Sequence, residues 1–242
     1  MYRFTVDQRR RRLAARHHLA SVADSVEQVA STLVGIHSTD PATVFLSCWA
    51  RVAGFRPEQL EDAMYEDRSL LRMLGMRRTM FVVPRDLAPV MDSACTQAFA
   101  AAERRRLIGF LEKQAVTADG DAWLARVEDS TMAALGRLGP ATANELSAEV
   151  PELTTKLTFG EGKTWGGTVG VSTRVLFLLA TNGRIVRGRP LGSWLSTQYR
   201  WVSLEDWVPD GLPPVETDSA QAELARSCLL YTSDAADDWL VV

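Results

Sequence analysis

The chain has few cysteines, and their positions argue against structural pairing. Cys48, Cys95 and Cys228 are odd in number, far apart and in no CxxC arrangement, which excludes a disulfide framework and a zinc site. His17 and His18 are neighbours on an expected helix and point in different directions, so they cannot chelate one metal. We therefore expect neither a metal nor another cofactor.

Long apolar runs are also missing. No segment approaches the roughly 18 uninterrupted apolar residues that a membrane-spanning helix needs. The opening residues, Met1 to Thr5, lack the apolar core of a signal peptide. We therefore expect a cytoplasmic protein with no membrane partner.

Acidic residues are absent from one long stretch of the chain. Lys and Arg number 27 and Asp and Glu number 30, which gives a net charge of −3, yet residues 162–204 contain no acid at all. The stretch holds six basic residues, namely Lys163, Arg174, Arg184, Arg187, Arg189 and Arg200. We expect a surface of one sign there, suited to the phosphates of duplex DNA. The arginines at 9–12 are open to two interpretations, a phosphate contact or a solvated helix face.

The order of expected elements repeats along the chain. Each half reads as helices with capping residues followed by a small hairpin, which is the pattern of a winged helix-turn-helix. We predict a mainly α fold with small β-hairpins (α+β), built from tandem winged helix-turn-helix units. The supporting segments are helices over 25–34, 40–53, 57–65, 123–138, 142–150 and 172–181, with strands over 70–73, 76–83, 184–187 and 193–202. Ser25 and Asp40 are expected to cap the first two helices, and Cys48 and Trp49 are expected on the buried face of the second. Residues 151–170 are expected to form a loop.

Winged helices place the second helix of the turn in the major groove and hold phosphates with flanking positive groups. Ser172, Thr173 and Arg174 begin that helix in the second unit. The DNA-contacting set that we predict comprises these residues with Lys163, Arg184, Arg187, Arg189 and Arg200, together with Arg77 and Arg78 of the first hairpin. The alternative is a winged helix that serves only as a protein-protein scaffold.

The order of several short motifs resembles the AlkZ/YcaQ-type winged-helix DNA glycosylases. These motifs run from Leu33 to Pro41, from Trp49 to Arg51, from Leu71 to Val83 and, in the second half, from Thr181 to Trp201. The resemblance implies tandem winged helices that form a concave DNA-binding face. It also implies removal of bulky alkylated purines, or unhooking of crosslinks, without a metal.

The resemblance places the catalytic pair of the family in the link from Ile36 to Asp40, commonly as Gln-x-Gln or Gln-x-Asp. This chain has His37, Ser38 and Thr39 there instead. Residues two apart in an extended link point the same way, so His37 and Thr39 could hold one water. A neutral imidazole accepts its proton and a hydroxyl orients it. The alternative is that His37 is a polar inter-helix residue and Thr39 part of the turn before the cap.

Two functions therefore stay open at this stage. The first is a DNA glycosylase-like repair protein that acts on alkylated bases, with His37 and Thr39 as catalytic residues. The second is a noncatalytic winged-helix DNA-binding protein or regulator. In both cases we expect a monomer that binds duplex DNA.

Four segments are expected from these patterns. The first winged-helix unit with its following helices covers 1–115, the second unit covers 116–212, and residues 213–226 form a linker and the start of a third unit. Residues 227–242 resemble translated sequencing-adaptor sequence, which predicts a gene fragment with a non-native tail. A short helical tail is the alternative.

Overall fold

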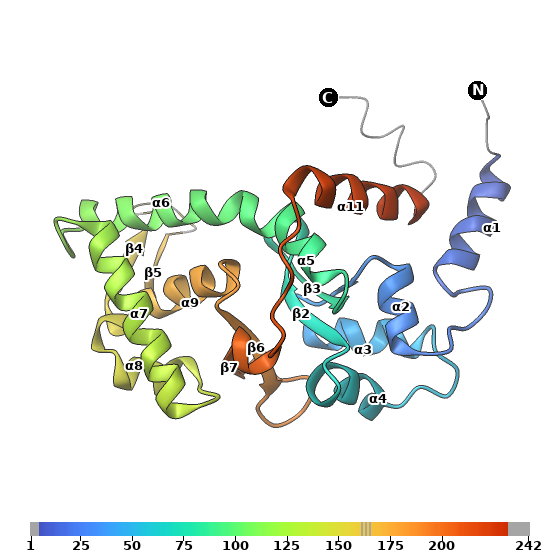
Figure 1. The fold of residues 1–242 in the computed structure, drawn as a ribbon, viewed down its shortest axis with the longest axis horizontal. Helices are drawn as coiled ribbons and strands as arrows, with labels where there is room; N and C mark the ends of the chain where they lie inside the picture. Colours follow the sequence, from blue (N-terminus) through green and yellow to red (C-terminus); the bar gives the residue numbers. More distant parts are fainter. Residues whose placement is uncertain (1–4, 161, 163, 165, 232–242) are drawn as a thin grey trace. The chain divides into compact units, whose positions relative to one another are not determined.

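The computed structural model describes residues 5–160, 162, 164 and 166–231. The chain folds into two compact units (Figure 1). The first comprises residues 1–95 and the segment from Leu212 onward, and the second comprises residues 96–211. None of the helices within the described residues combines the length and the apolar character that spanning a bilayer requires.

The first unit contains a winged helix. Its three strands form an antiparallel sheet in the order β1-β3-β2, in which Ile36 pairs with Val82 and Leu71 pairs with Val83. Helices precede, separate and follow the strands in the order that this fold requires. The elements are α1 (Val6–Arg16), α2 (Val26–Thr32), β1 (Ile36–His37), α3 (Pro41–Trp49), α4 (Pro57–Glu61) with the π-turn η1 (Asp62–Glu66), β2 (Leu70–Leu74), the 3-10 turn η2 (Met76–Arg78), β3 (Met80–Pro84), α5 (Ala88–Met91), η3 (Asp92–Thr96) and α11 (Thr217–Tyr231).

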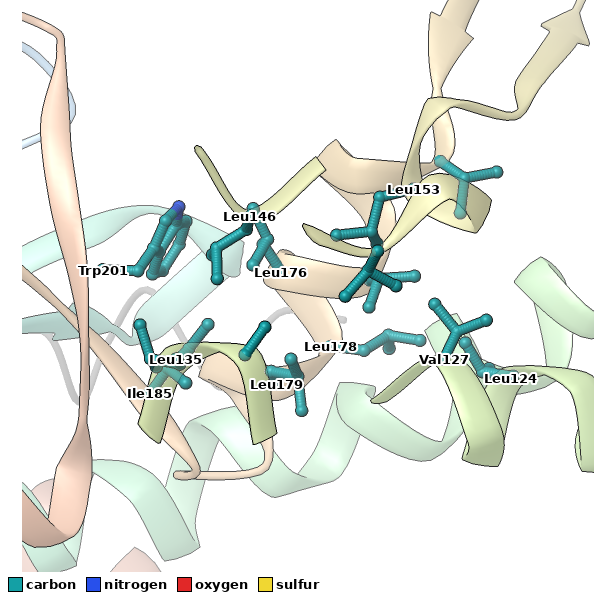
Figure 2. Packing of buried hydrophobic residues seen from close by; sticks show 14 of the residues in the cluster. Leu124, Val127, Leu135, Leu146, Leu153, Leu176, Leu178, Leu179, Ile185 and Trp201 are labelled. Atoms are coloured by element: carbon teal, nitrogen blue, oxygen red, sulfur yellow. The ribbon is translucent and has the colours of Figure 1, made fainter. Parts of the chain in front are cut away.

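The second unit repeats the plan around its own apolar core. Its first strand is reduced to one residue, Ala141, which pairs with Trp201. The buried face of α9 supplies Leu176, Leu178 and Leu179 to the core (Figure 2). The elements are α6 (Gln97–Lys113), α7 (Gly120–Leu138), α8 (Ala143–Glu149), η4 (Pro151–Thr154), β4 (Lys156–Phe159), β5 (Gly167–Gly170), α9 (Val171–Thr181), β6 (Ile185–Pro190), β7 (Tyr199–Ser203) and α10 (Leu204–Trp207). The expected tandem winged helix-turn-helix units are thus present.

The units divide the chain at other positions than the sequence patterns indicated. The boundary expected at 115/116 falls inside the second unit, because α6 packs on α7 and α9. The segment 212–231 returns to the first unit, where α11 packs on α5 and the Ser93 hydroxyl donates to the Val215 carbonyl at 2.9 Å. Residues 227–231 continue α11, and 232–242 lie outside the described residues.

Two local expectations were wrong. Residues 151–170, read as loop, contain the hairpin β4–β5, in which alternation buries Leu157 completely. Trp49, expected in the buried face of α3, is 69% exposed because it lies on the same side of the helix as the exposed Leu46, whereas Cys48 is fully buried as predicted.

Helix α2 begins with a side-chain cap whose loss should be measurable. The Ser25 hydroxyl accepts a hydrogen bond from the Gln28 backbone N–H at 3.2 Å. Ser25→Ala should lower the free energy of unfolding by about 1 kcal/mol, because a helix donor loses its acceptor. Ser31→Ala, an exposed position of the same helix, should be neutral or slightly stabilising. Urea unfolding of both variants checks this, and equal effects would contradict the capping role.

Candidate active site and nucleic-acid interface

The link between β1 and α3 is held in an extended form by the sheet. His37 pairs with Phe81 of β3, and the Ser38 backbone N–H donates to the Met80 carbonyl at 2.8 Å. Side chains of an extended segment alternate. Ser38 therefore points inward and is fully buried, while His37 and Thr39 are exposed on the other side.

His37 and Thr39 meet at the surface, as their spacing predicts. The Thr39 Oγ1 and His37 Nε2 atoms lie 3.2 Å apart, within hydrogen-bonding distance, with the donor set by the imidazole tautomer. The His37 ring also contacts Phe81 edge to face, with 5.5 Å between centroids and 85° between planes. The contact with Phe81 restricts the imidazole, so the pair presents one nitrogen and one hydroxyl to solvent in a defined arrangement.

The end of the link is fixed by a helix cap. The Asp40 carboxylate accepts from the Ala42 backbone N–H at 2.8 Å, and Pro41 occupies the first helical position. Asp40 therefore has a structural role at the start of α3, immediately after the exposed pair.

Arg72 supports the link from within the sheet. It lies on β2 opposite Val82, and its guanidinium donates to the Ser38 carbonyl at 2.7 Å and to the Ser38 hydroxyl at 3.3 Å. Two charge-assisted bonds to one buried residue hold the backbone between His37 and Thr39. We did not assign Arg72 from sequence. The available signal was a charged residue inside the short apolar strand Leu70–Leu74.

The first wing carries two exposed arginines on a strained backbone. Arg77 and Arg78 have φ angles of 56° and 59° at the tip of the β2–β3 hairpin. Left-handed conformations cost non-glycine residues roughly 1–2 kcal/mol each, and such strain concentrates at functional positions. Both arginines are exposed at this tip.

The basic residues of the second unit differ in their surroundings, and two of them form ion pairs. Arg184 faces Asp129 at 3.4 Å, and Arg200 pairs with Glu145 at 3.0 Å. Both acids lie on helices α7 and α8, outside the acid-free stretch, so the expected surface of one sign is partly neutralised. Arg189 is exposed on β6.

Arg174 and Arg187 lie against aromatic rings. The Arg174 guanidinium is 5.0 Å from the centroid of Phe159, and Arg187 lies 4.5 Å from Tyr199 and 5.7 Å from Trp201. Burial lowers the pKa of Arg187 below the ordinary arginine value, and Tyr199 offsets part of this effect. Arg187 therefore packs against the hairpin instead of being displayed on it, which changes the role that we expected for it.

The remaining residues that we predicted to contact DNA differ in their exposure. Ser172 is half-buried and Thr173 exposed on the first turn of α9. Lys163 lies outside the described residues. No group of His, Cys, Asp and Glu in the described part of the chain is arranged to hold a metal ion.

Comparison with known proteins assigns the class. The family model described as DNA glycosylase AlkZ-like matches residues 30–231, and the chain belongs to the AlkZ-like DNA glycosylase family. Among solved structures, the DNA glycosylase AlkZ of Streptomyces sahachiroi is similar, with a TM-score of 0.61 and 19% identity over 91% of this chain and 55% of that one. That likeness shows a shared fold, and this chain spans about half the length of the Streptomyces protein. No curated protein matches the chain.

Proposed function

We propose that this protein binds duplex DNA and hydrolyses the N-glycosidic bond of alkylated purines. Membership of the AlkZ-like DNA glycosylase family supports the class of reaction. The observation that carries the proposal is the exposed pair of His37 and Thr39, 3.2 Å apart on a link that β3 and Arg72 hold in place. We further propose that the protein acts as a monomer in the cytoplasm.

Hydrolysis of the N-glycosidic bond requires a positioned water and stabilisation of the positive charge that develops on the sugar. In the reaction, the bond from C1′ to the purine N9 breaks and its electron pair leaves with the base. Because an N7-alkylated purine is cationic, it departs as a neutral molecule. The oxygen of the water forms the new bond to C1′ and its proton passes to the His37 imidazole, while the Thr39 hydroxyl orients the water.

In this proposal, exposed arginine side chains contact the DNA phosphates. Arg77 and Arg78 of the first wing and Arg189 of the second are exposed. The start of α9, with Ser172 and Thr173, would contact the groove. Arg184 and Arg200 contribute less, because exchange of a carboxylate for a phosphate gains little Coulomb energy.

The direct test is base release by the whole chain. The protein is incubated with a duplex that carries one N7-methylguanine, and free base and abasic sites are measured by chromatography with mass detection. We expect free N7-methylguanine to form in proportion to protein concentration. Salt-sensitive binding without base release would instead identify a noncatalytic DNA-binding protein.

Arg77→Ala should weaken binding to duplex DNA by a similar factor for every DNA sequence, because the exposed Arg77 side chain is proposed to contact a phosphate. Loss of one phosphate contact lowers the slope of log affinity against log salt concentration by about 0.9. Fluorescence anisotropy at several salt concentrations measures this slope. Arg184→Ala, whose guanidinium faces Asp129, is the matched comparison and should change the slope less. Equal slopes for wild type and Arg77→Ala would contradict the assignment of Arg77 as a phosphate contact.

A further inference from the structure

A groove in the second unit has no part in the reaction described above. It lies between the first turn of α8 and the hairpin β6–β7, and its volume is about 290 Å³. This is close to the lower end of small-molecule sites, roughly 300 Å³. Its walls include Asn144 on one side and, on the other, four residues of the hairpin: Leu191, Gln198, Tyr199 and Trp201. The size suits one planar ring system better than an extended ligand.

The lining of the groove is neutral. The side chains that line it within the described part of the chain carry no charge. Glu145 and Arg200, which neighbour lining residues in sequence, pair with each other at 3.0 Å. A phosphate or a metal ion would find no opposite charge here, whereas a neutral aromatic ligand would lose little solvation.

The aromatic wall is rigid. Trp201 belongs to the buried cluster with Leu146 and Ile185 (Figure 2), and its backbone exchanges two hydrogen bonds with Ala141, at 2.6 and 3.0 Å. Tyr199 contacts Trp201 edge to face, with 5.1 Å between ring centroids. Arg187 packs against both rings. Such fixed aromatic surfaces stack bases without regard to sequence.

Two carboxamides complete the groove. Asn144 and Gln198 are exposed, and within the described residues neither side-chain amide makes a hydrogen bond. The backbone of Gln198 is held, because its carbonyl accepts from the Leu191 N–H at 2.8 Å. A carboxamide offers a donor and an acceptor side by side, which matches the edge of a nucleobase.

The groove lies next to the segment of the second unit that corresponds to the His37–Thr39 link of the first unit. Ala141 pairs with the last strand of its hairpin just before a helix cap, as His37 pairs with Phe81 just before the Asp40 cap. The three residues before the cap are Gly139, Pro140 and Ala141 in the second unit, where the first unit has His37, Ser38 and Thr39. The position is therefore equipped to bind and not to transfer a proton.

We propose that this groove binds one unpaired nucleobase of DNA, stacked on Tyr199, which the buried Trp201 holds in place edge to face, and hydrogen-bonded by Asn144 and Gln198. The inference rests on the proposed DNA binding but not on glycosylase activity. It gives the second unit a preference for DNA in which a base is free to leave the stack.

The test uses the full chain and two duplexes that differ by one base. Each has a single-nucleotide bulge, which carries adenine in one duplex and an abasic analogue in the other. Wild-type protein should bind the adenine bulge about tenfold more tightly. Asn144→Ala with Gln198→Ala should lower that ratio toward one without changing affinity for the abasic duplex, and Ser193→Ala, an exposed position of the same loop, should preserve it.

The outcomes separate this inference from the proposed function. Equal binding of the two bulges by wild-type protein, or a ratio unchanged by the double substitution, overturns the nucleobase site while DNA binding stands. Absence of binding to any duplex overturns both. Because both substituted side chains are exposed, their replacement should leave the fold intact, which circular dichroism checks.

Discussion

His37→Ala should slow release of N7-methylguanine by about 10²- to 10⁴-fold, the range typical of a lost general acid or base. The imidazole is the proton acceptor in the proposed reaction, and it lies 3.2 Å from the hydroxyl that orients the water. Because His37 is exposed, its loss should change neither the fold nor the affinity for DNA. Single-turnover kinetics with protein in excess measure the chemical step apart from product release.

His37→Gln provides the matched comparison. The resemblance gives an amide at this position in many members of the family, and an amide can hold the water although it is a poor proton acceptor. We expect a rate between those of wild type and His37→Ala. If His37→Ala releases base as fast as wild type, the imidazole has no part in the reaction.

Arg72→Met should lower the release rate by about 10²-fold, because a displacement of the reacting groups near 1 Å has an effect of that size. Arg72 acts as a positioning residue through its bonds to Ser38, at 2.7 and 3.3 Å. The substitution should also lower the free energy of unfolding by about 2 kcal/mol, since charge-assisted bonds to a buried group are lost. DNA affinity should be nearly unchanged.

A conservative replacement of Arg72 distinguishes a role in positioning the link from a role in stability alone. Arg72→Lys keeps the charge but not the planar fork, so it should recover part of the stability and less of the rate. Arg10→Met, on the exposed side of α1, is the control for loss of an arginine. A release rate that falls only as far as the folded fraction falls would assign Arg72 a structural role alone.

Local sequence signals predicted much of the fold. The Ser25 and Asp40 caps begin the helices expected of them. The spacing of His37 and Thr39 predicted a shared side of the link, because alternation in an extended segment is a local property.

The missed features depend on residues far apart in the chain. Arg184 meets Asp129 and Arg200 meets Glu145 across more than fifty residues, so charge counting along one stretch could not find these pairs. Arg72 reaches Ser38 over a separation of 34 residues and across the middle strand of the sheet. Such contacts follow from the topology of the unit rather than from local pattern.

The hairpin β4–β5 was missed for a different reason. It is short, and glycines surround it in the sequence, so the segment reads as loop. Its register, in which Leu157 pairs with Val169, is set by burial of Leu157 in the core of the second unit.

A double-mutant cycle on base release is the most direct test of the proposed reaction centre. Single-turnover rates are measured for wild type, His37→Ala, Arg72→Met and the double variant on the same alkylated duplex. If Arg72 acts by holding the link that carries His37, the double variant should release base no more slowly than His37→Ala. The proposal is contradicted if the two substitutions slow base release independently, so that their effects on the rate multiply in the double variant. It is also contradicted if His37→Ala releases base as fast as wild type.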